Sequence, residues 1–84
     1  MRTVKVYTKE NCDFSTAVIR LLDAREIPYE EVVLDLDSPE HRELGERTGS
    51  MKLPQAFIGA TPLGSTQEII AAEQSGMLAE LVQD

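Results

Sequence analysis

The chain has 84 residues, of which 42% are hydrophobic and 27% charged, and its formal net charge is −7. A chain this short buries only about 60% of its unfolded surface, which predicts one domain over residues 1–84 with a single modest core. The acidic balance excludes the basic surface that nucleic acids require, and no apolar run approaches the ~18 residues of a membrane span.

The first half of the chain predicts two strands joined by a helix. Residues 3–7 alternate β-forming side chains, and a polar loop follows over residues 8–11. No signal or transit segment precedes this strand, so the expected compartment is the cytoplasm. Apolar residues then recur at helical spacing from about Phe14 to Arg25, until a proline ends the helix before a strand at residues 29–34. The predicted buried stripe of this helix is Ala17, Val18, Leu21 and Leu22.

A short, mostly polar second helix follows. Ser38 is its predicted N-cap, Pro39 its first residue and Leu44 its core anchor, and Gly49 ends it in a left-handed conformation. His41 has no metal-ligand partner in the sequence and is expected at the surface.

The second half predicts a hairpin and a last helix. A strand over residues 53–59 opens on a proline, and a very short strand at Pro62-Leu63 follows a tight turn. Ser65 and Glu68 form a predicted capping box for a helix that runs to about Gln74. Its predicted core residues are Ile69, Ile70 and Ala72, and residues 77–82 add a further helical turn or two.

This order predicts an α/β fold, β-α-β-α-β-β-α. The first two strands should be parallel through a right-handed crossover, whereas the last two are too close in sequence for anything but an antiparallel hairpin. The expected product is a four-stranded mixed sheet with helices on both faces.

Cys12 is the only cysteine, and it stands where the first strand hands over to a helix N-terminus. Free N–H groups and the positive end of the helix dipole favour a thiolate there, and Lys9 adds a nearby cation. We therefore interpret Cys12 as a nucleophile rather than as an inert buried thiol. Asp13 opposes this by placing a carboxylate beside the sulfur. One cysteine excludes an intramolecular disulfide and a cysteine-rich zinc site, so any redox partner sulfur belongs to a second molecule.

Three segments together resemble the glutaredoxins, a family with the thioredoxin-like fold. Residues 7–15, Tyr-Thr-Lys-Glu-Asn-Cys-Asp-Phe-Ser, resemble the family's active-site segment Tyr-Thr-Lys-x-x-Cys-x-Phe/Tyr-Cys/Ser. Residues 53–58, Leu-Pro-Gln-Ala-Phe-Ile, resemble its Thr-Val-Pro-Gln-x-Phe-Ile strand, whose proline is cis and whose threonine stands one residue before the position of Leu53. Residues 64–69, Gly-Ser-Thr-Gln-Glu-Ile, resemble its Gly-Gly-x-Asp-Asp-Leu turn.

The sequence departs from the family pattern at several positions. Its Cys-Asp-Phe-Ser matches neither the dithiol Cys-Pro-Tyr-Cys nor the monothiol Cys-Gly-Phe-Ser, although Ser15 in place of a resolving cysteine makes it a monothiol Cys-x-x-Ser variant. Lys52, Ser65 and Gln67 replace the family's threonine, second glycine and first aspartate.

The resemblance implies a glutathione groove around Cys12. Lys9 would hold the thiolate or the glycyl carboxylate of glutathione, although without the neighbouring cysteine it would be a solvated loop lysine. A cis bond before Pro54 would turn the Leu53 backbone toward the ligand; the alternative is a trans proline that starts an edge strand.

At the other end of the implied groove, backbone donors at Ser65 and Thr66 would bind the γ-glutamyl carboxylate. Gln67 cannot supply the negative charge that would hold the α-amino group. Phe14 would flank the groove or else fill a core or staple position. Lys52 would offer a cation near the proline loop or remain a free surface lysine.

Three functions remain open at this point. The first is a monothiol glutathione-dependent thiol–disulfide oxidoreductase, which serves redox homeostasis and electron transport as a monomer acting on glutathionylated or disulfide-bearing proteins. The second is a [2Fe–2S] module in which Cys12 of two chains and two glutathiones hold the cluster, and no other metal site is expected. The third is a weakly active scaffold that only binds glutathione or peptide.

Overall fold

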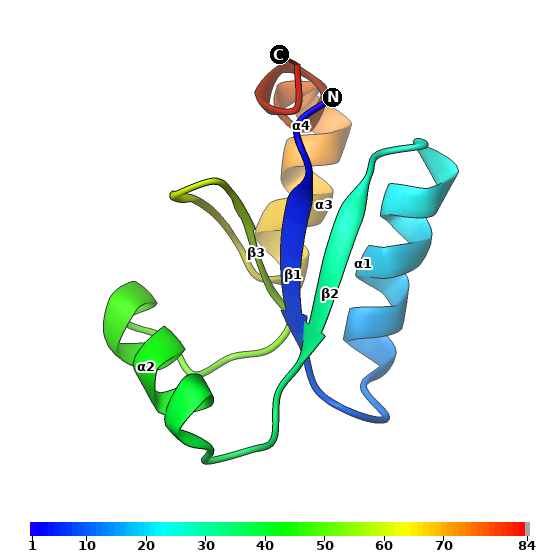
Figure 1. Ribbon diagram of the computed structural model, residues 1–84. Coiled ribbons are helices and arrows are strands. Elements are labelled where there is room, and N and C mark those ends of the chain that lie inside the picture. Colours follow the sequence, from blue (N-terminus) through cyan, green and yellow to red (C-terminus); the bar gives the residue numbers. More distant parts are fainter. Residues whose placement is uncertain (84) are drawn as a thin grey trace.

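The computed structural model describes residues 1–83. The chain folds into a four-stranded mixed sheet with helices on both of its faces (Figure 1). The elements in chain order are β1 (Val4–Thr8), α1 (Asp13–Ala24), β2 (Tyr29–Val33), α2 (Pro39–Thr48), β3 (Gln55–Ile58), β4 (Thr61–Gly64), α3 (Thr66–Ser75) and α4 (Met77–Leu81). The predicted β-α-β-α-β-β-α order is confirmed, and α4 is the further helical segment expected after Gly76.

The strands lie in the order β2-β1-β3-β4. β1 pairs with β2 in parallel and β3 with β4 in an antiparallel hairpin, as predicted. β1 and β3, whose pairing the sequence did not predict, are antiparallel. Tyr7, near the end of β1, is paired with Gln55 at the start of β3. The loop that follows β1 and the loop that precedes β3 therefore emerge at the same edge of the sheet. This edge holds both the cysteine and the proline singled out in the sequence.

One face of the sheet packs against α1, α3 and α4. Val4 and Val6 of β1 are 0% exposed and point into this core. The core also contains Val82, just after α4, and buried residues of the three helices, Val18, Leu22, Ile69, Ala72 and Leu78. Full burial of one such aliphatic side chain contributes about 1.5–3 kcal/mol. The chain ends meet over this layer, where the Arg2 N–H donates to the Val82 carbonyl at 2.7 Å (Figure 1).

The opposite face carries α2 and a smaller core. Leu44 of α2 packs with Leu34 and Phe57, and Tyr7 meets the Phe57 ring edge-on at a centroid distance of 5.8 Å. The α2 ends follow the sequence signals: the Ser38 hydroxyl accepts from the His41 N–H at 3.1 Å, and Gly49 has φ 74°. Local hydrogen bonds determine both ends, which is why residue types alone predicted them.

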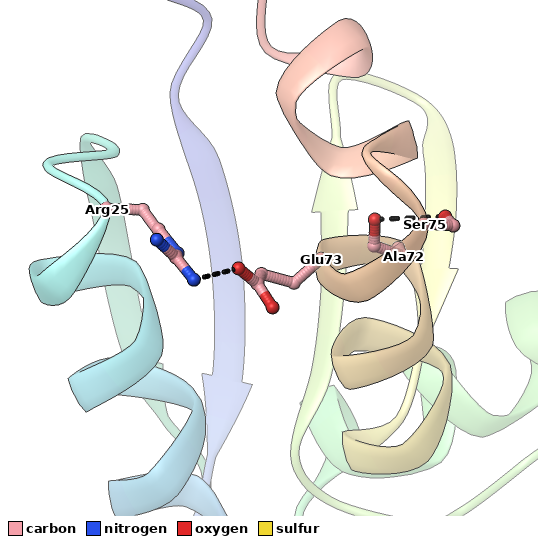
Figure 2. A network of polar contacts seen from close by, with 4 residues as sticks. All are labelled: Arg25, Ala72, Glu73 and Ser75. Carbon is pink, nitrogen blue, oxygen red and sulfur yellow. Dashed lines mark hydrogen bonds and ion pairs between the residues drawn. The ribbon is translucent and has the colours of Figure 1, made fainter.

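A surface ion pair links α1 to α3. Figure 2 shows the Arg25 guanidinium at the end of α1 reaching the Glu73 carboxylate of α3, with an N–O distance of 2.5 Å. The Arg25 side chain is 61% exposed, so this pair contributes roughly 0.2–1 kcal/mol. In the same view, the Ser75 hydroxyl donates to the Ala72 carbonyl at 3.2 Å near the end of α3.

Four sequence expectations were wrong. Ala17 and Ile70 are exposed rather than buried, because each lies at the edge of its helix's apolar stripe. Ser65 is the backbone N-cap of α3, but its side chain makes no capping hydrogen bond, so the capping box with Glu68 does not form. His41, expected at the surface, is only 4% exposed and hydrogen-bonded through both ring nitrogens.

Candidate functional site

Cys12 occupies the N-cap of α1, as the strand-to-helix transition predicted. Its backbone is extended, with φ −106° and ψ 112°, and its carbonyl accepts the first helical bond from the Thr16 N–H at 3.1 Å. The Thr16 hydroxyl also donates to that carbonyl, at 3.3 Å. The side chain is partly exposed. The sulfur therefore stands over the first turn of α1 and is not sealed in the apolar core.

The surroundings of this thiol favour its charged form. Partial burial raises the pKa of the Cys12 thiol, but the Ser15 hydroxyl, the N–H groups of Ser15 and Phe14, and the Lys9 charge together lower the pKa below its ordinary value. The lowering comes mainly from hydrogen bonds at the helix N-terminus, with the lysine as the smallest cause. The cause that these groups outweigh is burial; Asp13, expected from the sequence to oppose the thiolate, is not among the causes of the shift in the Cys12 pKa.

Ser15 fills the position where a dithiol site would have its second cysteine. The residue is 4% exposed, and its hydroxyl oxygen makes no well-formed hydrogen bond within residues 1–83. A buried hydroxyl without a fixed partner is uncommon, because losing water costs about 1–3 kcal/mol when nothing replaces it. Its O–H is therefore free to turn to the nearby sulfur, where a thiolate would accept it.

Two hollows adjoin this loop. The first, of about 480 Å³, contains Cys12 together with Asp13, Ser15, Arg20 and Glu31. The second is a cleft of about 460 Å³ that runs from the β1–α1 loop to the start of α3. Lys9 lines both of them, so the two hollows adjoin at this residue.

The cleft brings together six of the residues predicted to bind glutathione. They come from the β1–α1 loop, α1, the segment before β3 and the start of α3, and they are Lys9, Phe14, Leu53, Ser65, Thr66 and Gln67. Phe14 is 65% exposed, which excludes the core or staple position that the sequence left open. Cys12 is not among the residues that line this cleft; it lines the neighbouring hollow, which shares Lys9 with the cleft.

The proline of the third strand has the expected geometry. The Leu53-Pro54 bond is cis, and Pro54 is fully buried behind the cleft while Leu53 lines it. We find no hydrogen bond of the Leu53 backbone within residues 1–83. Its N–H and C=O are therefore open to an extended peptide.

Sequence reasoning missed part of the lining. Leu36 and Met51, from the loops on either side of α2, are 61% and 45% exposed and line the cleft. Nothing in their local sequence marks them, because they reach the cleft only through the position of α2. Glu68 also lines it, and no ion pair or hydrogen bond of its carboxylate is found within residues 1–83.

Charges of both signs face the cleft. Lys9 and Lys52 contribute two cations, and Glu68 contributes one carboxylate near the start of α3. Opposite charges in one groove complement a ligand that carries both carboxylate and ammonium groups. A short zwitterionic peptide is such a ligand, and the volume is suited to one.

Residues 1–83 contain neither a candidate metal cluster nor a candidate membrane-spanning helix. Among residues 1–83, no group of three or more His, Cys, Asp or Glu side chains is placed to hold a metal ion. Nor is any helix in that range long and apolar enough to cross a membrane.

Comparison with known proteins places these features in a family. The model of the family described as Glutaredoxin matches residues 4–62. Glutaredoxin 3 of Escherichia coli strain K12 is 29% identical over 83 residues, covering 99% of this chain and 100% of the relative. A glutaredoxin of Pseudomonas aeruginosa strain PAO1 is 32% identical, with 98% of each chain covered.

Solved glutaredoxin structures superpose closely. The holo form of glutaredoxin C1 from Populus tremula x tremuloides has a TM-score of 0.88 at 28% identity, covering 96% of this chain and 83% of that one. A buckwheat glutaredoxin–glutathione complex has a TM-score of 0.86 at 24% identity, covering 94% and 74%.

Proposed function

Because the chain belongs to the glutaredoxin family, we propose that it is a glutathione-dependent thiol–disulfide oxidoreductase that works with the single nucleophile Cys12. The observation that supports this most directly is the lowered pKa of a partly exposed thiol next to a cleft of mixed charge. A buried structural cysteine would have neither property.

The proposed reaction has two thiol–disulfide exchanges. The Cys12 thiolate attacks the glutathione sulfur of a glutathionylated protein, which forms a Cys12–glutathione disulfide and releases the protein's thiolate. The thiolate of a second glutathione then attacks the bound glutathione sulfur, so that oxidised glutathione leaves and the Cys12 thiolate is restored. In the net reaction the glutathionylated protein and one free glutathione give the protein thiol and oxidised glutathione, so the incoming glutathione thiol is the reductant. Ser15 cannot release the adduct, because a hydroxyl is no resolving thiol.

In this proposal glutathione lies in the cleft with its two ends at opposite charges. Lys9 takes the glycyl carboxylate, and the free backbone groups of Leu53 pair with the cysteinyl residue. The first amides of α3, at Ser65 and Thr66, take the γ-glutamyl carboxylate. Lys9 is also where the cleft meets the hollow of Cys12, so the ligand's sulfur would cross to the nucleophile there.

Glu68 would compensate for a departure from the family pattern. Gln67 cannot neutralise the α-ammonium group of the γ-glutamyl residue, but the next side chain along the helix is a free carboxylate in the same cleft. We assign the ammonium contact to Glu68.

The [2Fe–2S] alternative has no observation in its favour. Such a cluster needs four thiolates, which two chains would supply only together with two glutathiones, and Cys12 stands beside the exposed carboxylate of Asp13. That carboxylate places bulk and negative charge where the cluster would lie, so the oxidoreductase is the favoured function. We also propose that the protein acts as a monomer in the cytoplasm on glutathionylated proteins.

Loss of glutathione from a glutathionylated peptide tests the proposed function. We expect turnover by the wild type and none by Cys12→Ser, together with a single glutathione adduct on the wild type after incubation with oxidised glutathione, seen by intact-mass spectrometry. Thr16→Val is a matched control in the same turn, because its hydroxyl contacts the Cys12 carbonyl and not the sulfur. Equal turnover by wild type and Cys12→Ser, or no adduct on the wild type, would refute the proposal.

A further inference from the structure

The connector between α2 and β3, residues 49–54, forms one wall of the cleft. Met51, Lys52 and Leu53 line the cleft directly. A connector without regular structure has no ladder of its own to hold its backbone, so side chains must do so. Here the carbonyls of Ser50, Met51 and Lys52 all accept hydrogen bonds from side chains outside the connector.

His41 supplies the central bond. The Asp37 N–H donates to Nδ1 of His41 at 3.3 Å, so Nδ1 is the acceptor and the neutral ring carries its proton on Nε2. Nε2 then donates to the Met51 carbonyl at 2.9 Å. The ring is 4% exposed, and it joins the turn before α2 to the wall of the cleft.

Two further side chains hold the neighbouring carbonyls. The Thr48 hydroxyl, at the end of α2, contacts the Ser50 carbonyl at 3.0 Å and accepts from the Ser50 N–H at 3.2 Å. Gln55, which is 4% exposed, donates through Nε2 to the carbonyls of Ser50 and Lys52, both at 2.8 Å. The connector is thus held from the start of α2, the end of α2 and the start of β3.

We propose that His41 is a positioning residue for ligand binding, acting through its Nε2–H bond to the Met51 carbonyl. The bond holds the connector so that Leu53 presents its free backbone groups to the peptide in the cleft. The His41 ring lies behind the connector and touches no ligand, and its role is to fix the position of the connector backbone. The ligand's identity as glutathione rests on the proposed function, whereas the wall's position does not.

The Met51 side chain is secured separately. A Cβ atom at Gly45 would overlap the Met51 sulfur, so the absence of a side chain in mid-helix lets the thioether pack against α2. His41 therefore accounts for the backbone of residue 51, and Gly45 accounts for its side chain. A substitution at His41 should therefore affect the Met51 backbone, and a substitution at Gly45 the Met51 side chain.

Two substitutions of His41 distinguish the hydrogen bond made by Nε2 from the one made by Nδ1. His41→Gln keeps an amide donor near the place of Nε2, and His41→Asn keeps an acceptor near the place of Nδ1 but does not reach Met51. S-methylglutathione, which cannot react, reports binding by calorimetry. We expect His41→Asn to weaken its binding by roughly fivefold to tenfold, the value of one hydrogen bond as a ratio of affinities, and His41→Gln to stay within about twofold.

The Cys12 pKa separates positioning from general damage. Cys12 lines the other hollow, so the pH midpoint of its alkylation should be the same in wild type and both His41 variants. Val82→Ala, at a buried site in the distant core, is the control that lowers stability without changing the affinity for S-methylglutathione. Binding by His41→Asn as tight as in wild type, or by His41→Gln as weak as in His41→Asn, would overturn the proposal.

Amide hydrogen exchange gives a readout that needs no ligand. The Lys52 N–H, which donates to the Ser50 Oγ at 3.2 Å, should exchange faster in His41→Asn than in wild type, and at the wild-type rate in His41→Gln. If wild type fails to bind S-methylglutathione, the proposed function fails while exchange still decides the role of His41. If His41→Asn does not fold, Thr48→Val removes the hydrogen bonds between the Thr48 hydroxyl and residue 50 and should also speed exchange. Unchanged exchange would refute the proposal that side chains hold the connector in place.

Discussion

Gly64 gives a sharp prediction, because the end of β4 meets the first turn of α3 there. Gly64 has φ 90°, and a Cβ atom built on it would lie 2.8 Å from Cβ and 3.0 Å from Cγ of Glu68. Gly76, between α3 and α4, has φ 84° with nothing within 4 Å of such an atom. The two glycines thus share a positive φ but differ in surroundings.

Alanine at the two positions separates the backbone cost from the steric cost. A side chain in the left-handed region costs about 1–2 kcal/mol, and both variants incur it. Only Gly64→Ala must also displace Glu68, and because the nearest atom is a Cβ, the backbone of α3 has to move; such overpacking costs about 1–3 kcal/mol. Gly64→Ala should therefore unfold in urea with a free energy about 1–3 kcal/mol below that of Gly76→Ala, at an equal m-value.

Ligand affinity supplies the second readout. The first turn of α3 lines the cleft, so Gly64→Ala should weaken binding of S-methylglutathione severalfold while Gly76→Ala leaves it unchanged. Equal losses of stability in the two variants, or wild-type affinity in Gly64→Ala, would contradict the steric argument.

Two further predictions concern the charges of the site. Ser15→Ala removes a hydroxyl that lowers the Cys12 pKa, so the midpoint of the alkylation rate against pH should move upward and the thiolate fraction at neutral pH should fall. Thr16→Val should leave that midpoint in place, and an unchanged midpoint in Ser15→Ala would show that the hydroxyl does not serve the sulfur. Glu68→Gln should weaken the binding of glutathione by roughly threefold to tenfold, within the range for a charge-assisted hydrogen bond on a partly exposed surface. It should not weaken the binding of an analogue that lacks the α-amino group. Equal losses for both ligands would exclude the ammonium contact.

Local signals predicted the frame of the molecule well. The ends of α2 at Ser38 and Gly49 are set by hydrogen bonds within a few residues, so residue type suffices to find them. The alternation of Val4 and Val6 with polar neighbours gave β1 to within one residue. The cis bond before Pro54 was expected from the family pattern alone and is confirmed.

Errors arose where a residue's environment is built by distant parts of the chain. His41 was expected at the surface because its own helix is polar, yet the ring is buried against the Met51 carbonyl, ten residues away. The capping box failed because Glu68 turns along Gly64 instead of toward Ser65. Leu36 has no local pattern that would mark it as part of the cleft.

Residue order and local chemistry determined that this chain forms a βαβ unit and a hairpin with a thiol at a helix N-cap, because strand alternation, helix caps and the cysteine's place act over a few residues. Only the tertiary structure decided that Lys9 lines both the cleft and the hollow of Cys12, that the Glu68 carboxylate has no partner among residues 1–83, and that a buried histidine is hydrogen-bonded to the Met51 carbonyl. These features depend on distances between segments far apart in sequence, which packing of helices on the two faces of the sheet establishes.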